Sequence, residues 1–214
     1  MNIAILGWGS LIWCPGSLRI RTLWRSDGPR LPIEFARISQ DDRLTLVIHS
    51  PRLARSSDVL GFQRIRQPER RARQSQASGK DQVWRYSSRL RDGSGGAGAA
   101  RETIQTLTEW IEQHPDVEAV VWTGLQSNWQ EKRGCPFALQ DAMNFLSALE
   151  AERDRAKAAY DRAREYMTNA PSAVDTPVRQ AMRVRGWHDI QLSSTLFEST
   201  AAPPSAPESP RENG

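Results

Sequence analysis

The sequence predicts an α+β protein in which an antiparallel or barrel-forming sheet carries the helices. Short apolar runs at residues 3–6, 31–39 and 44–49 have the length and composition of strands. Asp41-Asp42 supplies turn chemistry between the second and third runs, so these two form a hairpin. Strand, turn and strand follow one another without an intervening helix, which argues against alternating βαβ units.

The first run ends abruptly in Gly7-Trp8-Gly9-Ser10. Two glycines permit backbone angles that side chains forbid, and successive N–H groups in such a turn can point at one anionic group. A plain tight turn between strands is the alternative. The spacing excludes three known anion or nucleophile motifs. Ile12 replaces the third glycine of a dinucleotide fingerprint, no lysine completes a P-loop, and Ser10 lies outside the frame of a nucleophile elbow.

Four further segments complete the predicted order. Residues 100–113 form an amphipathic pattern, with Ile104, Leu107 and Ile111 on one face and Trp110 beside them. Residues 117–125 read as another buried strand, and residues 137–167 are helical in pattern, apolar early and charged later. Thr176-Pro177 has the chemistry of a helix start, and that helix is expected to end near Gly186.

The predicted organisation is one domain over residues 1–190 and a disordered tail over residues 191–214, rich in Ala, Pro, Ser and Glu from residue 199 onward. Within the domain, residues 61–92 stand apart as a basic, divergent and poorly ordered stretch. Between Phe62 and Asp92 there are nine Lys/Arg and three Asp/Glu, a charge of +6 (9 − 3). The chain as a whole carries +4, so the remainder is −2 (4 − 6) and is not basic.

The two cysteines and the absence of long apolar runs predict a cytoplasmic protein. Cys14 and Cys135 have neither CxxC nor metal-ligand spacing, so we expect free, buried thiols in a reducing compartment. No apolar run approaches the ~20 residues of a membrane span, so no membrane partner is expected. The start shows no signal-peptide pattern.

Several segments resemble a long bacterial branch of the gamma-glutamylcyclotransferase-like family. Gly7-Trp8-Gly9-Ser10-Leu11 is similar to that family's [YW]-G-S-[NL] loop. Residues 27–39, 43–48, 118–125 and 170–177 resemble the same branch in the same order, and the similarity covers about residues 1–60 and 94–187. The loop alone is a weak motif, whereas the ordered set is fairly specific.

The resemblance implies a small six-stranded β-barrel, mixed or antiparallel, flanked by helices. It also implies an activity: conversion of a small γ-glutamyl substrate to 5-oxoproline and a free amine by intramolecular aminolysis. That reaction needs no metal, cofactor or protein nucleophile, but it needs a bent substrate and a proton shuttle. Gly7, Trp8, Gly9, Ser10 and Leu11 are the implied substrate-binding residues, with Trp8 walling the pocket and the Gly9-Ser10-Leu11 amides holding a carboxylate or carbonyl oxygen.

The family's catalytic glutamate has no matching motif in this sequence. Glu34, an acid on an apolar strand, is the one catalytic candidate, although a paired structural carboxylate is the more common role for such a residue. A compensated frameshift over residues 61–92 would explain the loss, because a one-base shift lets residues 78–81 read Arg-Glu-(Lys or Arg)-Thr. A genuine basic insert is the other explanation, and sequencing the gene over this region separates the two.

Three functions therefore follow from the sequence. The chain is a cyclotransferase-like enzyme, active or inactivated, or it is a binding module that keeps the pocket without the chemistry. As a third function, it binds nucleic acid through the Arg-rich residues 62–91 with Trp84 and Tyr86 for stacking. The third is the least favoured, because the basic residues match no known fold. The sequence leaves the amine portion of the substrate and the oligomeric state open.

Overall fold

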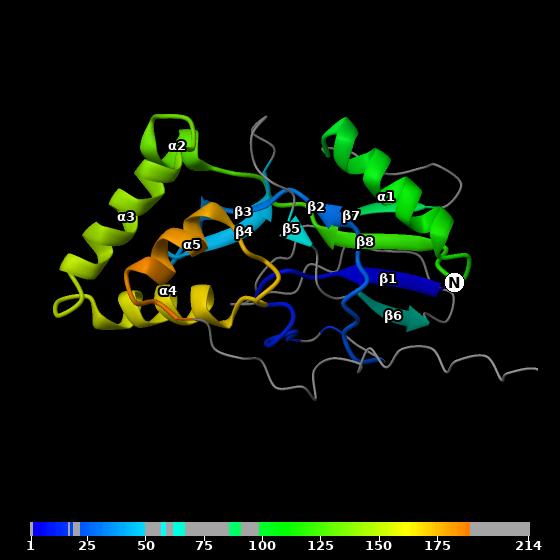
Figure 1. The fold of residues 1–214 in the computed structure, drawn as a ribbon, viewed down its shortest axis with the longest axis horizontal. Coiled ribbons are helices and arrows are strands. Elements are labelled where there is room, and N and C mark those ends of the chain that lie inside the picture. The colour runs from blue at the N-terminus through cyan, green and yellow to red at the C-terminus, as the bar shows by residue number, and fades with distance from the viewer. Residues whose placement is uncertain are drawn as a thin grey trace, which may run out of the picture.

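A computed structural model describes residues 2–16, 18, 22–49 and 99–188, together with the backbone of strands at residues 57–58, 62–66 and 86–90. Its largest sheet has four strands in the order β6-β1-β8-β7. These are β1 (Asn2–Leu6), β6 (Phe62–Arg66), β7 (Tyr86–Leu90) and β8 (Ala119–Thr123). Apolar β1 and β8 lie side by side and parallel at the centre, with Ile3 opposite Ala119, and both outer strands run antiparallel to them (Figure 1).

A hairpin of β3 (Ile33–Ile38) and β4 (Leu44–Ile48) forms a separate two-stranded sheet. Its turn is the predicted one, and Asp42 adopts the positive φ of 59° that such a turn requires. The pairing register shifts between Glu34 and Arg37, which places a bulge in β3 opposite Leu46. A third sheet pairs β2 (Arg30–Leu31) with β5 (Ser57–Asp58).

The expected six-stranded barrel is wrong. A barrel closes only when each strand pairs on both edges. In the described part of the chain, β6 and β7 each pair on one edge, and β3 and β4 pair only with each other. Pro32 supplies one physical reason, because it has no N–H for a ladder and separates β2 from β3 within the predicted run at residues 31–39. The result is a mixed α/β arrangement of three small sheets.

Five helices of the described ranges cover the two sides of this arrangement. The predicted amphipathic helix α1 (Arg101–Gln113) packs on the four-stranded sheet and buries Leu107, Trp110 and Ile111 (Figure 1). The helical pattern at residues 137–167 is divided into α3 (Leu139–Ala151) and α4 (Lys157–Asn169). With α2 (Trp129–Arg133) and α5 (Pro177–Val184), these helices gather around the β3–β4 hairpin at the other end of the molecule.

The start of α5 follows the prediction from Thr176-Pro177. The Thr176 side chain accepts a hydrogen bond from the Arg179 N–H at 3.2 Å, and proline occupies the first turn. The chain leaves the helix through Gly186, whose φ is 87°. This cap fixes the N-terminus of α5 beside β3, a position that matters for Glu34 below.

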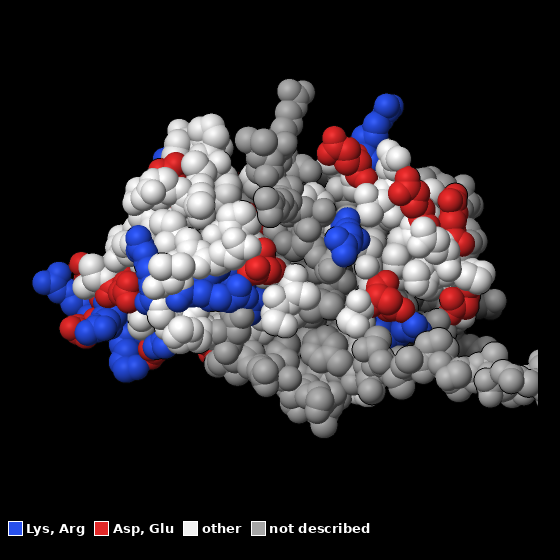
Figure 2. Space-filling model, viewed as in Figure 1, with Lys and Arg blue, Asp and Glu red and all other residues white. Residues whose placement is uncertain are grey.

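Both cysteines are free, as predicted, but neither is buried: Cys14 is exposed and Cys135 is partly exposed. None of the helices in the described ranges is long and apolar enough to cross a bilayer. The tail at residues 191–214 and most of residues 61–92 lie outside the described residues, and so do the Arg-rich side chains of the nucleic-acid hypothesis. Figure 2 shows acidic side chains gathered over α1, which carries Glu102, Glu109 and Glu112.

Candidate functional site

The loop that follows β1 turns sharply because two of its carbonyl groups accept hydrogen bonds from within the loop. The Ile12 N–H donates to the Gly9 carbonyl at 2.9 Å, and the Cys14 N–H donates to the Ser10 carbonyl at 2.6 Å. Among the described residues, the N–H groups of Gly9, Ser10 and Leu11 donate no hydrogen bond to another backbone group, and the Ser10 N–H donates to the Tyr166 hydroxyl instead. The loop therefore keeps these amides out of sheet pairing, which the predicted binding of an anionic group by the loop requires.

Close packing fixes the position of this loop. A Cβ at Gly7 would lie 2.8 Å from the Trp24 ring, so only glycine fits there. The buried Trp8 side chain donates from its Nε1 to the Leu46 carbonyl at 3.2 Å, which ties the loop to β4. Trp8 consequently serves as an anchor in the core as well as a wall of the site.

A cavity of about 120 Å³ lies beside this loop. All five residues predicted to bind substrate line it, namely Gly7, Trp8, Gly9, Ser10 and Leu11. The cavity also brings together side chains far apart in the sequence: Arg37, Ser39, Arg43 and Thr45 from the hairpin, Thr123 and Leu125 from the end of β8, and Tyr166 from α4. We call it the Gly9 cavity.

Two guanidinium groups give the Gly9 cavity a positive side. Arg37 donates from Nη1 to the Gln126 carbonyl at 2.7 Å and forms no ion pair with the acidic side chains that the structure describes. Arg43 is paired with Asp41, Nε to Oδ2 at 2.9 Å. No Asp or Glu lies among the described residues that line the cavity. Cationic side chains and open backbone amides together suit a small anionic group.

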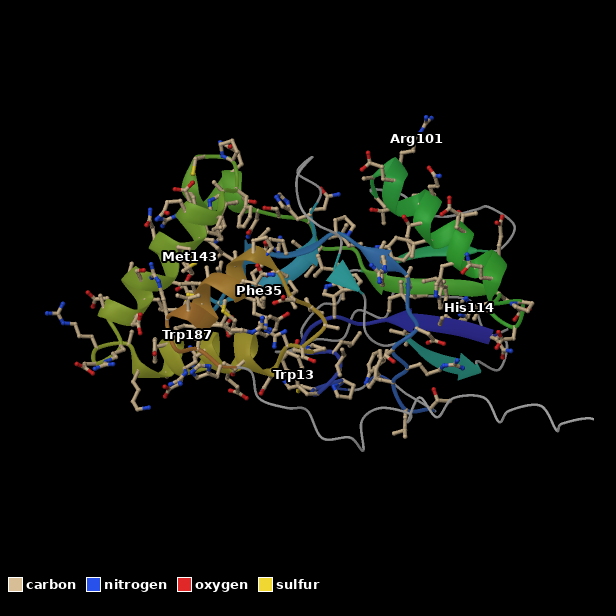
Figure 3. The ribbon with its side chains drawn as sticks, viewed as in Figure 1. Trp13, Phe35, Arg101, His114, Met143 and Trp187 are labelled. Carbon is tan, nitrogen blue, oxygen red and sulfur yellow. The ribbon has the colours of Figure 1, made fainter. Side chains whose placement is uncertain are left out.

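Tyr166 reaches the same loop from α4. Its buried ring meets Trp13 edge-on at 5.5 Å and Phe35 at 6.3 Å, between centroids. Figure 3 labels both partners on the side of the molecule where α4 and α5 pack. The Tyr166 hydroxyl lies directly against Gly9, where a Cβ would come within 2.4 Å of the oxygen. Gly9 is therefore required by this contact and not by its φ angle.

Burial raises the pKa of the Tyr166 hydroxyl above its usual value of 10. The Arg43 charge and the hydrogen bonds from the Leu46 backbone and from the backbone and side chain of Ser10 lower this pKa only in part. Leu46 lies opposite the bulge in β3, outside the paired register of the hairpin. The phenol is therefore a neutral, proton-bearing group at neutral pH. It faces two backbone donors and one cation.

Glu34, the catalytic candidate from the sequence, lies elsewhere. Its side chain is 3% exposed and is not among the described residues that line the Gly9 cavity. The carboxylate accepts from the Phe35 N–H at 2.7 Å, and its other partners are Thr176 and the Val178 N–H at the start of α5. Burial raises the pKa of Glu34 to about 7, and these hydrogen bonds lower it only in part. The residue joins β3 to a helix N-terminus, which is a structural position.

A larger cavity of about 300 Å³ adjoins the first, and Thr123 and Leu125 line both. Its described lining carries no Asp, Glu, Lys or Arg; His49 is its one titratable side chain there. Burial lowers the pKa of His49, and its Nε2 has no hydrogen-bond partner in the described structure. The larger cavity is thus neutral, and the smaller one is lined by the Gly9 loop and the two arginines. We place the anion-binding chemistry in the smaller one.

Sequence reasoning found the loop and missed Arg37, Arg43 and Tyr166 as neighbours of it. Arg37 and Arg43 lay inside a recognised block, where an alternating strand pattern could have placed Arg37 and Thr45 on one face. Tyr166 had no such signal, because the docking of α4 against β4 is a tertiary contact.

We compared the chain with protein-family models, with curated proteins and with solved structures, and none of these three searches returned a match.

Proposed function

We propose that the protein binds a small γ-glutamyl compound in the Gly9 cavity and converts it to 5-oxoproline and a free amine. One observation carries the proposal. All five loop residues singled out in the sequence line a single cavity, and two arginines from a distant hairpin line it with them. The resemblance of the loop and of the ordered segments to gamma-glutamylcyclotransferase-like proteins supplies the substrate class.

The charges suggest how such a ligand would lie. The α-carboxylate pairs with Arg37, the cation that has no ion pair among the described acids, and with the Gly9 and Leu11 amides of the loop. Arg43 remains paired with Asp41. Burial raises the pKa of Asp41, but the hydrogen bonds from Ser39 and Arg43 and the charge of Arg43 together outweigh burial, so this pKa lies below its usual 3.8. The amine portion extends past Thr123 and Leu125 into the neutral, larger cavity.

The reaction is intramolecular, so the protein acts mainly through pose. The α-amine attacks the γ-carbonyl of the same molecule, and holding the bent conformer removes much of the entropic barrier, up to ~7–11 kcal/mol in well-oriented cases. Loop amides directed at the carbonyl oxygen stabilise the negative charge that develops on it. A rigid loop, anchored by Trp8 and closely packed at Gly7, suits this task.

The second candidate function is binding without turnover. It is favoured by a specific observation: no carboxyl group is found among the described residues of the Gly9 cavity, and Glu34 faces α5 instead. In that case the pocket would hold its ligand but lack the proton shuttle that aminolysis needs.

One experiment separates the two functions. Purified protein is titrated calorimetrically with a γ-glutamyl amide, and release of 5-oxoproline from the same compound is followed by chromatography. We expect binding and release in the wild type. Binding without release supports the second function, and absence of binding by any γ-glutamyl compound contradicts both. A matched titration with α-glutamyl isomers controls for general attraction of anions.

A further inference from the structure

We propose that the Tyr166 hydroxyl is the proton donor of the Gly9 cavity, in the place where a carboxyl group would be expected. This inference rests on the proposed function, because it assigns the proton transfer of that same site to a residue. It starts from position. Tyr166 lines the cavity, and its hydroxyl lies against Gly9, next to the amides that are expected to hold the substrate.

The orientation of the hydroxyl follows from its neighbours. A phenolic hydroxyl has one proton to donate and lone pairs that accept. The backbone N–H groups of Ser10 and Leu46 both face the Tyr166 oxygen and occupy its accepting side. The proton is therefore directed away from them, toward the cavity that a ligand would occupy. Ser10, which lines the cavity as well, can pass a proton from Tyr166 to a bound ligand.

The surroundings hold this hydroxyl in one place. The Tyr166 ring packs edge-on against Trp13 and Phe35, and its backbone belongs to α4. Arg43 lies over the ring, with its guanidinium carbon 5.5 Å from the centroid. This charge favours a transient tyrosinate, whereas burial keeps the pKa of the resting phenol above its ordinary value. Such a group gives up its proton only when a basic atom reaches it.

Tyr166 can carry out both proton transfers of the reaction. The attacking α-amine forms a C–N bond to the γ-carbonyl carbon and loses a proton, while the bond to the leaving nitrogen breaks and that nitrogen gains a proton. Tyr166 gives its proton to the leaving nitrogen, directly or through Ser10, and then takes up the proton that the attacking nitrogen loses. No other reactant is consumed, and the phenol is restored after each turnover.

Tyr166→Phe tests this assignment, with Tyr160→Phe as the matched control. Both residues lie on α4, and both rings have edge-on aromatic partners, but the Tyr160 ring meets Trp187 and does not line the cavity. The rate of 5-oxoproline release and the Kd for the γ-glutamyl amide are measured for each protein. For Tyr166→Phe we expect kcat to fall by about 10²–10⁴-fold, the usual contribution of a general acid, with Kd nearly unchanged. Tyr160→Phe keeps the wild-type rate.

Three results would overturn the assignment. If Tyr166→Phe keeps the wild-type kcat, another group supplies the proton. If kcat, ligand affinity and thermal stability all decline together, the hydroxyl has a structural role only. If the wild type binds the γ-glutamyl amide but releases no 5-oxoproline, the proton-donor role fails while the binding proposal stands. A wild type that does not bind at all is a different result, because it removes the proposed function itself.

Discussion

Glu34 and the Gly9 cavity are two polar centres built on the same hairpin, and they differ in what surrounds them. Glu34 is 3% exposed, and Phe35, Thr176 and Val178 hydrogen-bond its carboxyl group. The Gly9 cavity has loop amides outside sheet pairing, Arg37 and a volume of about 120 Å³. A buried acid whose hydrogen-bonding groups are all satisfied thus has a structural role. A binding site forms where hydrogen-bond donors line a cavity.

The largest expected effect concerns the pH dependence of stability at Glu34. Its folded pKa of about 7 lies above the ordinary 4.5, so the folded state binds the proton more tightly than the unfolded state. The stability that this proton contributes is complete below pH 4.5 and is lost as the pH rises to about 7. The shift corresponds to roughly 3 kcal/mol. Glu34→Gln should flatten this slope in urea unfolding between pH 4.5 and 7.5.

A flat wild-type profile over that range would show that Glu34 is not buried as described. If Glu34→Gln instead abolished 5-oxoproline release while leaving the stability profile unchanged, Glu34 would have a catalytic role in place of the structural one.

Binding should depend on Arg37 and not on an exposed arginine. Loss of a hydrogen-bonded charge costs about 1.5–3 kcal/mol, so Arg37→Met should weaken binding of a γ-glutamyl amide by roughly 10- to 100-fold in calorimetry. Arg101→Met is the control, because Arg101 points into solvent from the start of α1 (Figure 3). Equal losses in the two variants would indicate general electrostatic attraction in place of a specific site.

The contact between Gly9 and Tyr166 predicts a double-mutant rescue. Gly9→Ala would place a Cβ 2.4 Å from the Tyr166 hydroxyl, and such overpacking costs about 1–3 kcal/mol. In a Tyr166→Phe background the obstructing oxygen is gone, although the ring carbon that bore it would still be at 3.3 Å. The same glycine substitution should therefore destabilise less in denaturant unfolding. Additive costs in the double mutant would contradict the contact.

The smallest expected effect is at Thr176, which serves the structural centre alone. Thr176→Ala removes the cap that accepts from the Arg179 N–H and a hydrogen bond to Glu34. We expect a loss of about 1 kcal/mol in unfolding free energy. The apparent pKa of Glu34 should rise further, because a group that lowers it is gone. Ligand affinity should be preserved, and a large loss of affinity would show that the two centres are coupled.

The elements of the fold follow from local patterns more closely than their assembly does. The Asp41-Asp42 turn, the Thr176-Pro177 cap and the apolar face of α1 were predicted because each is a property of a few neighbouring residues. The barrel was wrong because closure depends on pairing between strands distant in the chain, and Pro32 and the bulge in β3 interrupt it. Likewise, the sequence predicted the loop of the site but not Tyr166, because the contact between this residue and the loop depends on how α4 packs, and α4 is distant from the loop in the chain.

The central claim is that the amides at the end of β1 hold a small γ-glutamyl acid, and the most direct measurement is a ¹H–¹⁵N NMR titration of the uniformly labelled protein. On addition of a γ-glutamyl amide, the account predicts that the amide signals of Gly9, Ser10 and Leu11 shift in a saturable manner, whereas those of Phe35 and Val178 around Glu34 remain in place. Saturable shifts at Phe35 and Val178, with the three loop amides unmoved, would contradict it.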